Sequence, residues 1–310
     1  SLEQRGKLHV CVSCGKKRMT RYIDNETNAF LPEKYGRCAR LNNCAYHLNP
    51  YHDGYGKQDK LLDEKPKEKL PVYFLPDDVL KQTFKGYDVN VFIQNLPFQF
   101  EQWKEVVNLY RIGTVTGGDF KGATTFPYVD IDFKIRTIQV QLFDDNQKET
   151  KSTYLSAIYD EYFRSQKNTK PSWLSKVQQN EENESCLFGE HLLKKFPNNT
   201  IALVDDIKTA IYATFYFGMP KTESDFVFLA EKNLTSLNYQ KCKVLEGKKV
   251  TLFPNVSSDQ KSLAQWVKRA KTFEQNIEKS TFIVSDFLED QATTLDREQS
   301  LSLYDFLIKK

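Results

Sequence analysis

Four of the six cysteines lie within 34 residues near the amino terminus, as the pairs Cys11 and Cys14, and Cys38 and Cys44. The first pair is a CxxC followed by Gly15, and five residues separate the members of the second pair. Each pair can occupy a turn, and a metal ion can tie the two turns together. Zinc takes four ligands at tetrahedral geometry, and thiolates suit it. The spacing therefore predicts one structural Zn²⁺ held by these four cysteines.

Other interpretations of the cysteines remain open. The interval between Cys38 and Cys44 is wide for a zinc site, and His47 is an alternative ligand. Two disulfides in a secreted domain are less favoured, because no secretory signal is visible. A redox-active CxxC is also less favoured, because no βαβ pattern surrounds it. The pattern is most typical of a zinc ribbon, whose folding free energy comes largely from metal binding.

Basic side chains surround the predicted zinc ligands. Residues 1–57 carry ten Lys and Arg against five Asp and Glu, whereas the whole chain has a net charge of +3. Cations neutralise phosphates and aromatic rings stack on unpaired bases, so we expect this module to bind DNA, preferably single-stranded. The residues expected to make these contacts are Lys16, Lys17, Arg18, Arg21, Tyr22, Arg37 and Arg40. The alternative is a solvated basic face around a structural metal.

The length of 310 residues, with 40% apolar and 27% charged side chains, is typical of a folded chain of two or three domains. The zinc ribbon is predicted over 1–56, and the charged, proline-containing stretch 57–70 is predicted to be a linker. Residues 71–185 form a mixed α+β segment with helices at 77–84, 97–110 and 154–163 and strands at 123–133 and 134–144. The polar stretch 166–184 is predicted to be a loop.

From residue 186 onward, predicted strands alternate with predicted helices. The strands are expected at 201–206, 225–230, 248–255 and 280–287, and the longer helices at 207–217 and 257–275. Each strand is a continuous apolar run, which indicates a parallel sheet covered on both faces. The fold class is therefore α+β and α/β: an N-terminal zinc ribbon, a β-rich middle segment, and a C-terminal α/β domain over 186–310 with a mostly parallel sheet.

This order of modules resembles the layout of bacterial primases, and more specifically the primase-like zinc-ribbon and Toprim proteins of bacterial mobile elements. In the ribbon the resemblance rests on C-V-S-C-G-K-K-R and Y-G-R-C-A-R-L-N-N-C-A-Y-H-L-N-P-Y. In the α/β domain it rests on L-F-G-E-H-L-L, I-A-L-V-D-D-I-K-T-A and K-K-V-T-L-F-P-N. It covers most of the chain. It implies a Toprim-like domain, a role in mobile-element DNA replication, transfer or regulation, and a replication or mobilisation protein as partner.

The resemblance also implies a magnesium site from which this chain departs. A working Toprim site resembles one strand ending in Val-Glu and a later strand ending in Asp-x-Asp, whose carboxylates hold Mg²⁺. Here Asp205 stands where Glu is expected, and the neutral Asn255 stands where a carboxylate is expected. We expect an inactive site, with Asp205, Asp206 and Asp259 as catalytic residues only if it is active. The two aspartates could equally be a helix N-cap, and Lys208 could meet a phosphate or be solvated.

Three functions follow from these patterns. The first is a nucleic-acid-binding protein with a degenerate Toprim-like domain, and the lost carboxylate at position 255 favours it. The second is a magnesium-dependent primase or nicking nuclease, and the third is a protein–protein adaptor. No run of about 18 apolar residues is present, which argues against a transmembrane helix. We therefore expect a cytoplasmic protein that has no membrane partner.

Overall fold

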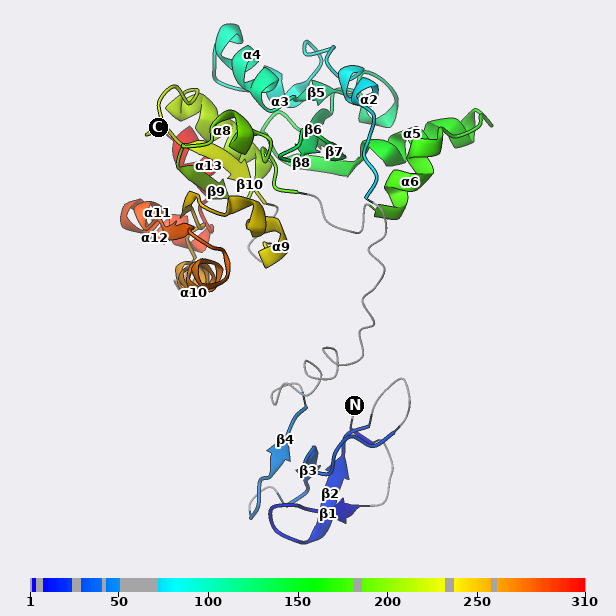
Figure 1. Cartoon of the computed structure of the whole chain (residues 1–310), viewed down its shortest axis with the longest axis vertical. Helices are drawn as coiled ribbons and strands as arrows, with labels where there is room; N and C mark the ends of the chain where they lie inside the picture. The colour runs from blue at the N-terminus through cyan, green and yellow to red at the C-terminus, as the bar shows by residue number, and fades with distance from the viewer. Residues whose placement is uncertain are drawn as a thin grey trace. The chain divides into compact units, whose positions relative to one another are not determined.

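The chain divides into two compact units, Ser1–Leu70 and Pro71–Lys310 (Figure 1). A computed structural model describes residues 2–3, 8–23, 29–40, 43–50, 72–180, 186–231, 237–257 and 261–309. The linker predicted over 57–70 and the domain boundary predicted at 185 lie outside the described residues. Within that part of the chain, no helix combines the length and the apolar character needed to cross a bilayer.

The first unit is built on a four-stranded antiparallel sheet with the order β1-β2-β3-β4. Its strands are β1 (His9–Val10), β2 (Lys17–Arg21), β3 (Gly36–Cys38) and β4 (His47–Leu48). Among the described residues of this unit, Cys11, Met19 and Cys38 form a small buried cluster, and Tyr22 and Tyr35 are buried outside it. So small a core buries little apolar surface, and a structural metal is a common way to stabilise such a module.

The second unit contains an antiparallel sheet with the order β5-β6-β7-β8. The strands are β5 (Gly113–Thr114), β6 (Thr124–Val129), β7 (Ile135–Phe143) and β8 (Glu149–Tyr154). Strands β6 and β7 lie where the alternating pattern predicts strands. The turn between them is fixed by Asp130, whose carboxylate accepts hydrogen bonds from the backbone amides of Asp132 and Lys134 and from Arg136.

Five α-helices accompany this antiparallel sheet in the described part of the chain. They are α2 (Asp77–Lys81), α3 (Val91–Gln94), α4 (Phe100–Leu109), α5 (Leu155–Ser165) and α6 (Ser172–Asn180). Helices α2, α4 and α5 lie within the predicted helical stretches or within two residues of them. The prediction of a loop over 166–184 is wrong, because α6 forms there. Among residues 172–178 of this polar helix, only Leu174 and Val177 are fully buried, one turn apart, which is too weak a pattern to recognise.

The second sheet is parallel throughout, with the order β10-β9-β11-β12, as the apolar runs predict. Its strands are β9 (Ile201–Val204), β10 (Val227–Ala230), β11 (Lys249–Leu252) and β12 (Thr281–Val284). Every residue of β9 and β10 is buried, which explains why these strands read as continuous apolar runs rather than as alternating ones.

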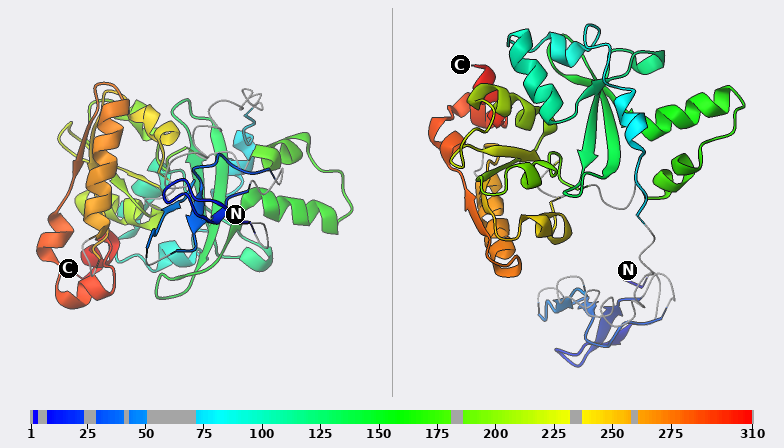
Figure 2. Two further views of the ribbon diagram at one scale, coloured as in Figure 1. Left: turned by 90° about the horizontal axis from the view of Figure 1, so that it is seen from below. Right: turned by 45° about the horizontal axis from the view of Figure 1, so that its top comes forward.

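Seven α-helices accompany the parallel sheet in the described residues (Figure 2). They are α7 (Leu192–Lys195), α8 (Ile207–Phe217), α9 (Tyr239–Cys242), α10 (Lys261–Asn276), α11 (Phe287–Gln291), α12 (Thr294–Glu298) and α13 (Leu303–Ile308). The sequence pattern does not predict α11–α13, which are too short to show a periodicity. Capping boxes at Thr293 and Ser302 start α12 and α13, and these were readable signals.

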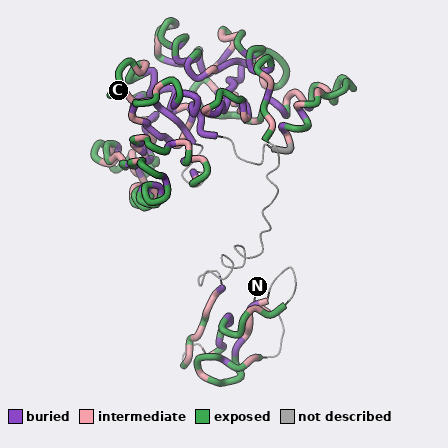
Figure 3. Tube along the Cα trace, viewed as in Figure 1, coloured by how far each residue is buried: buried purple, intermediate pink, exposed green. Residues whose placement is uncertain are grey.

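One hydrophobic core joins the antiparallel and parallel sheets of the second unit (Figure 3). The Tyr110 hydroxyl bonds the hydroxyl of Thr214 and donates to the carbonyl oxygen of Phe228, at 2.8 Å each. The buried Glu190 carboxylate accepts hydrogen bonds from the backbone amides of Ile131 and Leu187, both at 3.1 Å. The segment around Glu190 is therefore fixed to the turn between β6 and β7.

Candidate zinc centre and sheet-end carboxylates

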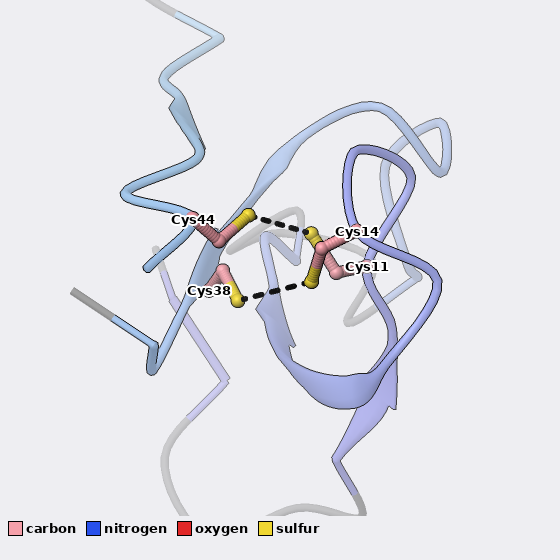
Figure 4. Close-up of side chains that lie close together, drawn as sticks. All are labelled: Cys11, Cys14, Cys38 and Cys44. Carbon is pink, nitrogen blue, oxygen red and sulfur yellow. Dashed lines mark hydrogen bonds between the residues drawn. The ribbon is translucent and has the colours of Figure 1, made fainter. Parts of the chain in front are cut away.

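The four cysteines of the first unit converge as the sequence predicts (Figure 4). Their Sγ atoms all lie within 4.8 Å of one another. The Sγ atoms of Cys11 and Cys44 are 3.8 Å apart, and those of Cys14 and Cys38 are 4.0 Å apart, with no disulfide. Tetrahedral zinc with Zn–S bonds of about 2.3 Å requires S···S separations of about 3.8 Å. The four thiols therefore fit a Zn²⁺ ion, and they would hold it as a structural site.

The turn between β1 and β2, the end of β3 and the residues before β4 bring the sulfurs together at one end of the ribbon sheet. The amide of Gly15 donates to the carbonyl of Cys11 at 2.9 Å, and Gly15 has a φ of +66°, which glycine adopts at little cost. The backbone amide of Lys16 is the main cause that lowers the pKa of the Cys14 thiol, to about 6. This amide favours the thiolate, which is the form that binds zinc.

His47, the alternative ligand, lies on β4 and is not part of the sulfur cluster. Its Nε2 atom is 3.0 Å from the hydroxyl oxygen of Tyr22, and the two rings are parallel with centroids 6.2 Å apart. The side chain of Tyr22 is consequently buried rather than available for stacking on a base. The predicted stacking role of Tyr22 finds no support in its surroundings.

Two of the predicted basic residues share one exposed face of the ribbon sheet. Successive residues of a strand point to opposite faces, so Arg18 and Thr20 lie opposite the buried Met19. Thr20 pairs with Arg37, and Arg37 pairs with His47. We call Arg18, Thr20, Arg37 and His47 the basic face. Within the described residues, neither arginine side chain has a hydrogen bond or an ion pair.

The other predicted basic residues lie elsewhere. The guanidinium of Arg21 donates to the carbonyl oxygen of Leu31 and lies over the ring of Phe30, 4.9 Å from its centroid. Arg40 lies beside Cys14 and helps to lower the pKa of that thiol. Lys16 and Lys17 are exposed around the first turn. Of the predicted set, the geometry therefore brings only Arg18 and Arg37 together on the basic face.

In the second unit, the carboxyl ends of β9 and β11 meet at one edge of the parallel sheet. Asp205 follows β9, and Asn255 follows β11 by three residues. The Asn255 Nδ2 atom donates a hydrogen bond to the Asp205 carboxylate at 2.6 Å. From β9 the chain passes to one side, to β10, and it then crosses to the other side, to β11. Ligands of open α/β sheets bind at such a reversal.

The charged side chains at this edge, Asp205, Asp206 and Lys208, are buried or have partners within the second unit. Burial, and then the nearby Asp206 carboxylate, raise the pKa of Asp205 to about 7. Asp206 is the N-cap of α8, where its side chain accepts a hydrogen bond of 3.0 Å from the amide of Lys208. The Nζ atom of Lys208 lies 4.0 Å from the ring centroid of Tyr304 and 3.3 Å from the carbonyl oxygen of Gln147. Asp206 and Lys208 thus have structural partners.

Asp259, the third predicted acid, lies outside the described residues. The sequence reasoning missed Glu231, which directly follows β10 as Asp205 follows β9. Glu231 is buried, and the Nζ atom of Lys241 lies 3.0 Å from its carboxylate. Its position directly after a continuous apolar strand could have indicated that it lies at the carboxyl end of the sheet. Across the described part of the chain, the four cysteines are the one group of three or more His, Cys, Asp or Glu residues close enough to share a metal.

Several solved structures are similar to this chain at low sequence identity. The DnaG primase catalytic domain bound to single-stranded DNA has 10% identity and a TM-score of 0.43, over 75% of this chain and 83% of that chain. The zinc-binding and RNA polymerase domains of Aquifex aeolicus primase have 10% identity and a TM-score of 0.38, over 94% and 77%. The primase fragment of the bacteriophage T7 primase-helicase protein has 11% identity and a TM-score of 0.37, over 97% and 100%.

Comparison with curated proteins finds no match. Two family models match the sequence. A zinc beta-ribbon finger model matches residues 1–60, the region that holds the four cysteines, and supports the assignment of a structural zinc site there. The second model matches residues 90–256, which is more than half of the chain. By this match, the chain belongs to the family described as "Domain of unknown function (DUF6371)".

Proposed function

We propose that this protein binds single-stranded DNA through the basic face of its zinc ribbon. The observation that carries the proposal is the placement of Arg18 and Arg37 on one exposed face, with no side-chain partner among the described residues. A guanidinium binds phosphate through paired, charge-assisted hydrogen bonds. Arginines that support the fold are normally paired, as Arg136 is with Asp130. Two unpaired arginines on adjacent strands fit a phosphodiester backbone.

The zinc ion would support this face through the strands. Arg37 directly precedes the ligand Cys38, and Arg18 lies four residues after the ligand Cys14. Two of the three buried residues in the ribbon's hydrophobic cluster are the ligands Cys11 and Cys38, so zinc would help to hold the strands at the spacing that places both guanidinium groups together. DNA binding should therefore depend on the metal although the metal does not touch DNA.

We further infer that the parallel sheet forms a Toprim-like domain without catalytic activity. Mg²⁺ is held by carboxylates and waters. The amide of Asn255 brings no charge and donates to the Asp205 oxygen that a cation would need. The raised pKa of Asp205, about 7, favours its neutral form further. A role in mobile-element DNA replication, transfer or regulation, with a replication or mobilisation protein as partner, rests on the sequence resemblance.

Binding titrations test the proposed function. Fluorescence anisotropy with single-stranded and double-stranded oligonucleotides at two salt concentrations should show tighter binding to the single strand. Arg18→Gln/Arg37→Gln should weaken this binding, and the slope of log K against log salt should fall by about 1.4, at about 0.7 per lost contact. Lys121→Gln/Lys221→Gln is the matched control, because it removes two exposed lysines of the second unit. If the wild type binds no oligonucleotide at low salt, the protein–protein adaptor becomes the better hypothesis.

A further inference from the structure

A pair of helices projects from the antiparallel sheet of the second unit (Figures 1 and 2). We call α5, residues 166–171 and α6 the helical arm. Its base is anchored by Leu155 and Val177, which belong to a hydrophobic cluster with Ile135 and Val140 of β7. Its outer end, formed by the end of α5 and residues 166–171, extends away from this cluster. The side chains at that end are therefore not required for packing against the sheet.

The outer end of the arm is held in place by its own contacts. The buried Asp160 carboxylate pairs with Arg164, one turn later on α5, and with Lys170 in the connection between the helices. The amide of Asn168 donates to the carbonyl of Phe163 at 3.0 Å and closes the end of α5. Two cations around one carboxylate also leave a net positive charge. The arm thus presents a fixed conformation and a positive tip.

Exposed aromatic and basic side chains occur together at this tip. The residue Tyr162 is 57% exposed, and the side chain of Arg164 is 74% exposed although it contacts Asp160. Lys167 is exposed as well. Residues 155–180 carry four basic and two acidic side chains, and one of the acids is the paired Asp160. The second unit as a whole has more acidic than basic residues, so the arm is a local positive surface.

Tyr162 is the outermost of a series of neighbouring aromatic rings. Its ring centroid lies 5.5 Å from that of Phe163, which in turn lies 6.4 Å from Tyr159. Tyr159 contacts the ring of Trp173 on α6, at 5.8 Å between centroids. The outermost ring of this series is the most exposed one. An exposed ring that packs on other, less exposed aromatic rings is a suitable surface for stacking an unpaired nucleobase.

We propose that the helical arm is a second contact site for single-stranded nucleic acid. Tyr162 stacks on a base, and Arg164 and Lys167 neutralise neighbouring phosphates. This proposal rests on the proposed function, because it assigns the same ligand, a single strand, to a second surface of the chain. Charge complementarity favours a nucleic acid over an apolar protein segment as the occupant. Two sites on one chain raise the effective concentration of each for a long strand, so affinity should increase with oligonucleotide length.

Anisotropy titrations with two labelled oligo-dT strands test the proposal. One strand has about 8 nucleotides, enough for a single site, and the other has about 40. Tyr162→Ala/Lys167→Gln should weaken binding of the long strand about fivefold or more and leave the short strand unchanged. The salt slope for the long strand should fall by about 0.7. Tyr162→Phe should keep the wild-type affinity, because stacking needs the ring and not the hydroxyl.

Tyr216→Ala/Lys221→Gln is the matched control, since it removes another exposed tyrosine and another exposed lysine of the same unit. Thermal melting of each variant checks that the fold is intact. If the long strand binds the arm variant and the control equally well, the arm is not a binding site, although the ribbon function stands. If the wild type binds neither strand, both proposals fail. A wild type that binds both strands with equal affinity also overturns the arm site alone.

Discussion

The side-chain amide of Asn255 donates a hydrogen bond of 2.6 Å to the carboxylate of Asp205, across the carboxyl ends of the neighbouring strands β11 and β9. A second carboxylate at position 255 would face Asp205 at this distance and would need a cation between them. The amide removes that need, because it satisfies Asp205 without a metal. The pair explains how two side chains from strands 50 residues apart can remain close at this edge of the sheet.

The Asn255–Asp205 pair predicts that only one of two variants responds to Mg²⁺. Asn255→Ala removes the donor from a largely buried carboxylate and should lower the free energy of unfolding by about 1–3 kcal/mol, with or without Mg²⁺. Asn255→Asp adds a like charge and should also destabilise, but Mg²⁺ should restore part of its melting temperature. Thermal melts at pH 8 with and without Mg²⁺ check this. An equal response of both variants to Mg²⁺ would contradict the role assigned to the amide.

Protonation of Asp205 predicts how stability depends on pH. The ordinary pKa of an aspartate is about 3.9, and burial raises that of Asp205 to about 7 in the folded chain. Between these values the folded state binds the extra proton, so this residue's contribution to stability falls as pH rises from about 4 to about 7. Asp205→Asn should lose this dependence. Urea unfolding at pH 5 and pH 7.5 should show the variant gaining stability relative to wild type at the higher pH, and a constant difference would contradict the assignment.

Zinc removal should affect the ribbon selectively. The four cysteines are the predicted ligands, and the hydrophobic cluster beside them has only three buried residues, so Cys14→Ser should reduce zinc content and unfold the first unit. Binding of a short single strand, which depends on the ribbon, should be lost while the second unit keeps its melting transition. Cys242→Ala is the control, because Cys242 is a free buried thiol outside the cluster. Metal analysis of the wild type should give one zinc per chain, and a wild type without zinc would overturn the site.

The sequence could predict those features that depend on chemistry in short segments. Cysteine spacing predicted the sulfur cluster, and continuous apolar runs predicted the parallel strands, because full burial requires such runs. Side-chain direction could not be predicted without the strand register. The sequence placed Arg18, Arg21 and Tyr22 in one binding set. In the structure Arg18 is exposed and has no side-chain partner among the described residues, Arg21 lies over Phe30, and Tyr22 is buried against His47.

Contacts between segments far apart in the sequence could not be predicted from the sequence pattern either. The bond between Asn255 and Asp205 follows from the strand order, which places β11 beside β9 rather than beside β10. The partners of Lys208 come from α13 and from the turn before β8, segments that carry no signal of their proximity. The helical arm could not be predicted for a different reason, which is that α6 has only a weak apolar pattern.

Among the described residues, no three acidic side chains lie close enough together at the end of the parallel sheet to share a metal ion. We expect neither primer synthesis nor strand nicking above background with Mg²⁺ or Mn²⁺. Asp205 is shorter by one methylene than the glutamate of the resembled motif, and a displacement of about 1 Å can cost about 10²-fold in rate. Asp206 is occupied as the N-cap of α8, and Asn255 supplies no charge. Assays should compare wild type with Asp205→Ala, with DNA binding by both proteins confirmed first. Activity in the wild type that disappears in Asp205→Ala would show a working magnesium site and would favour the primase or nuclease function over the binding function.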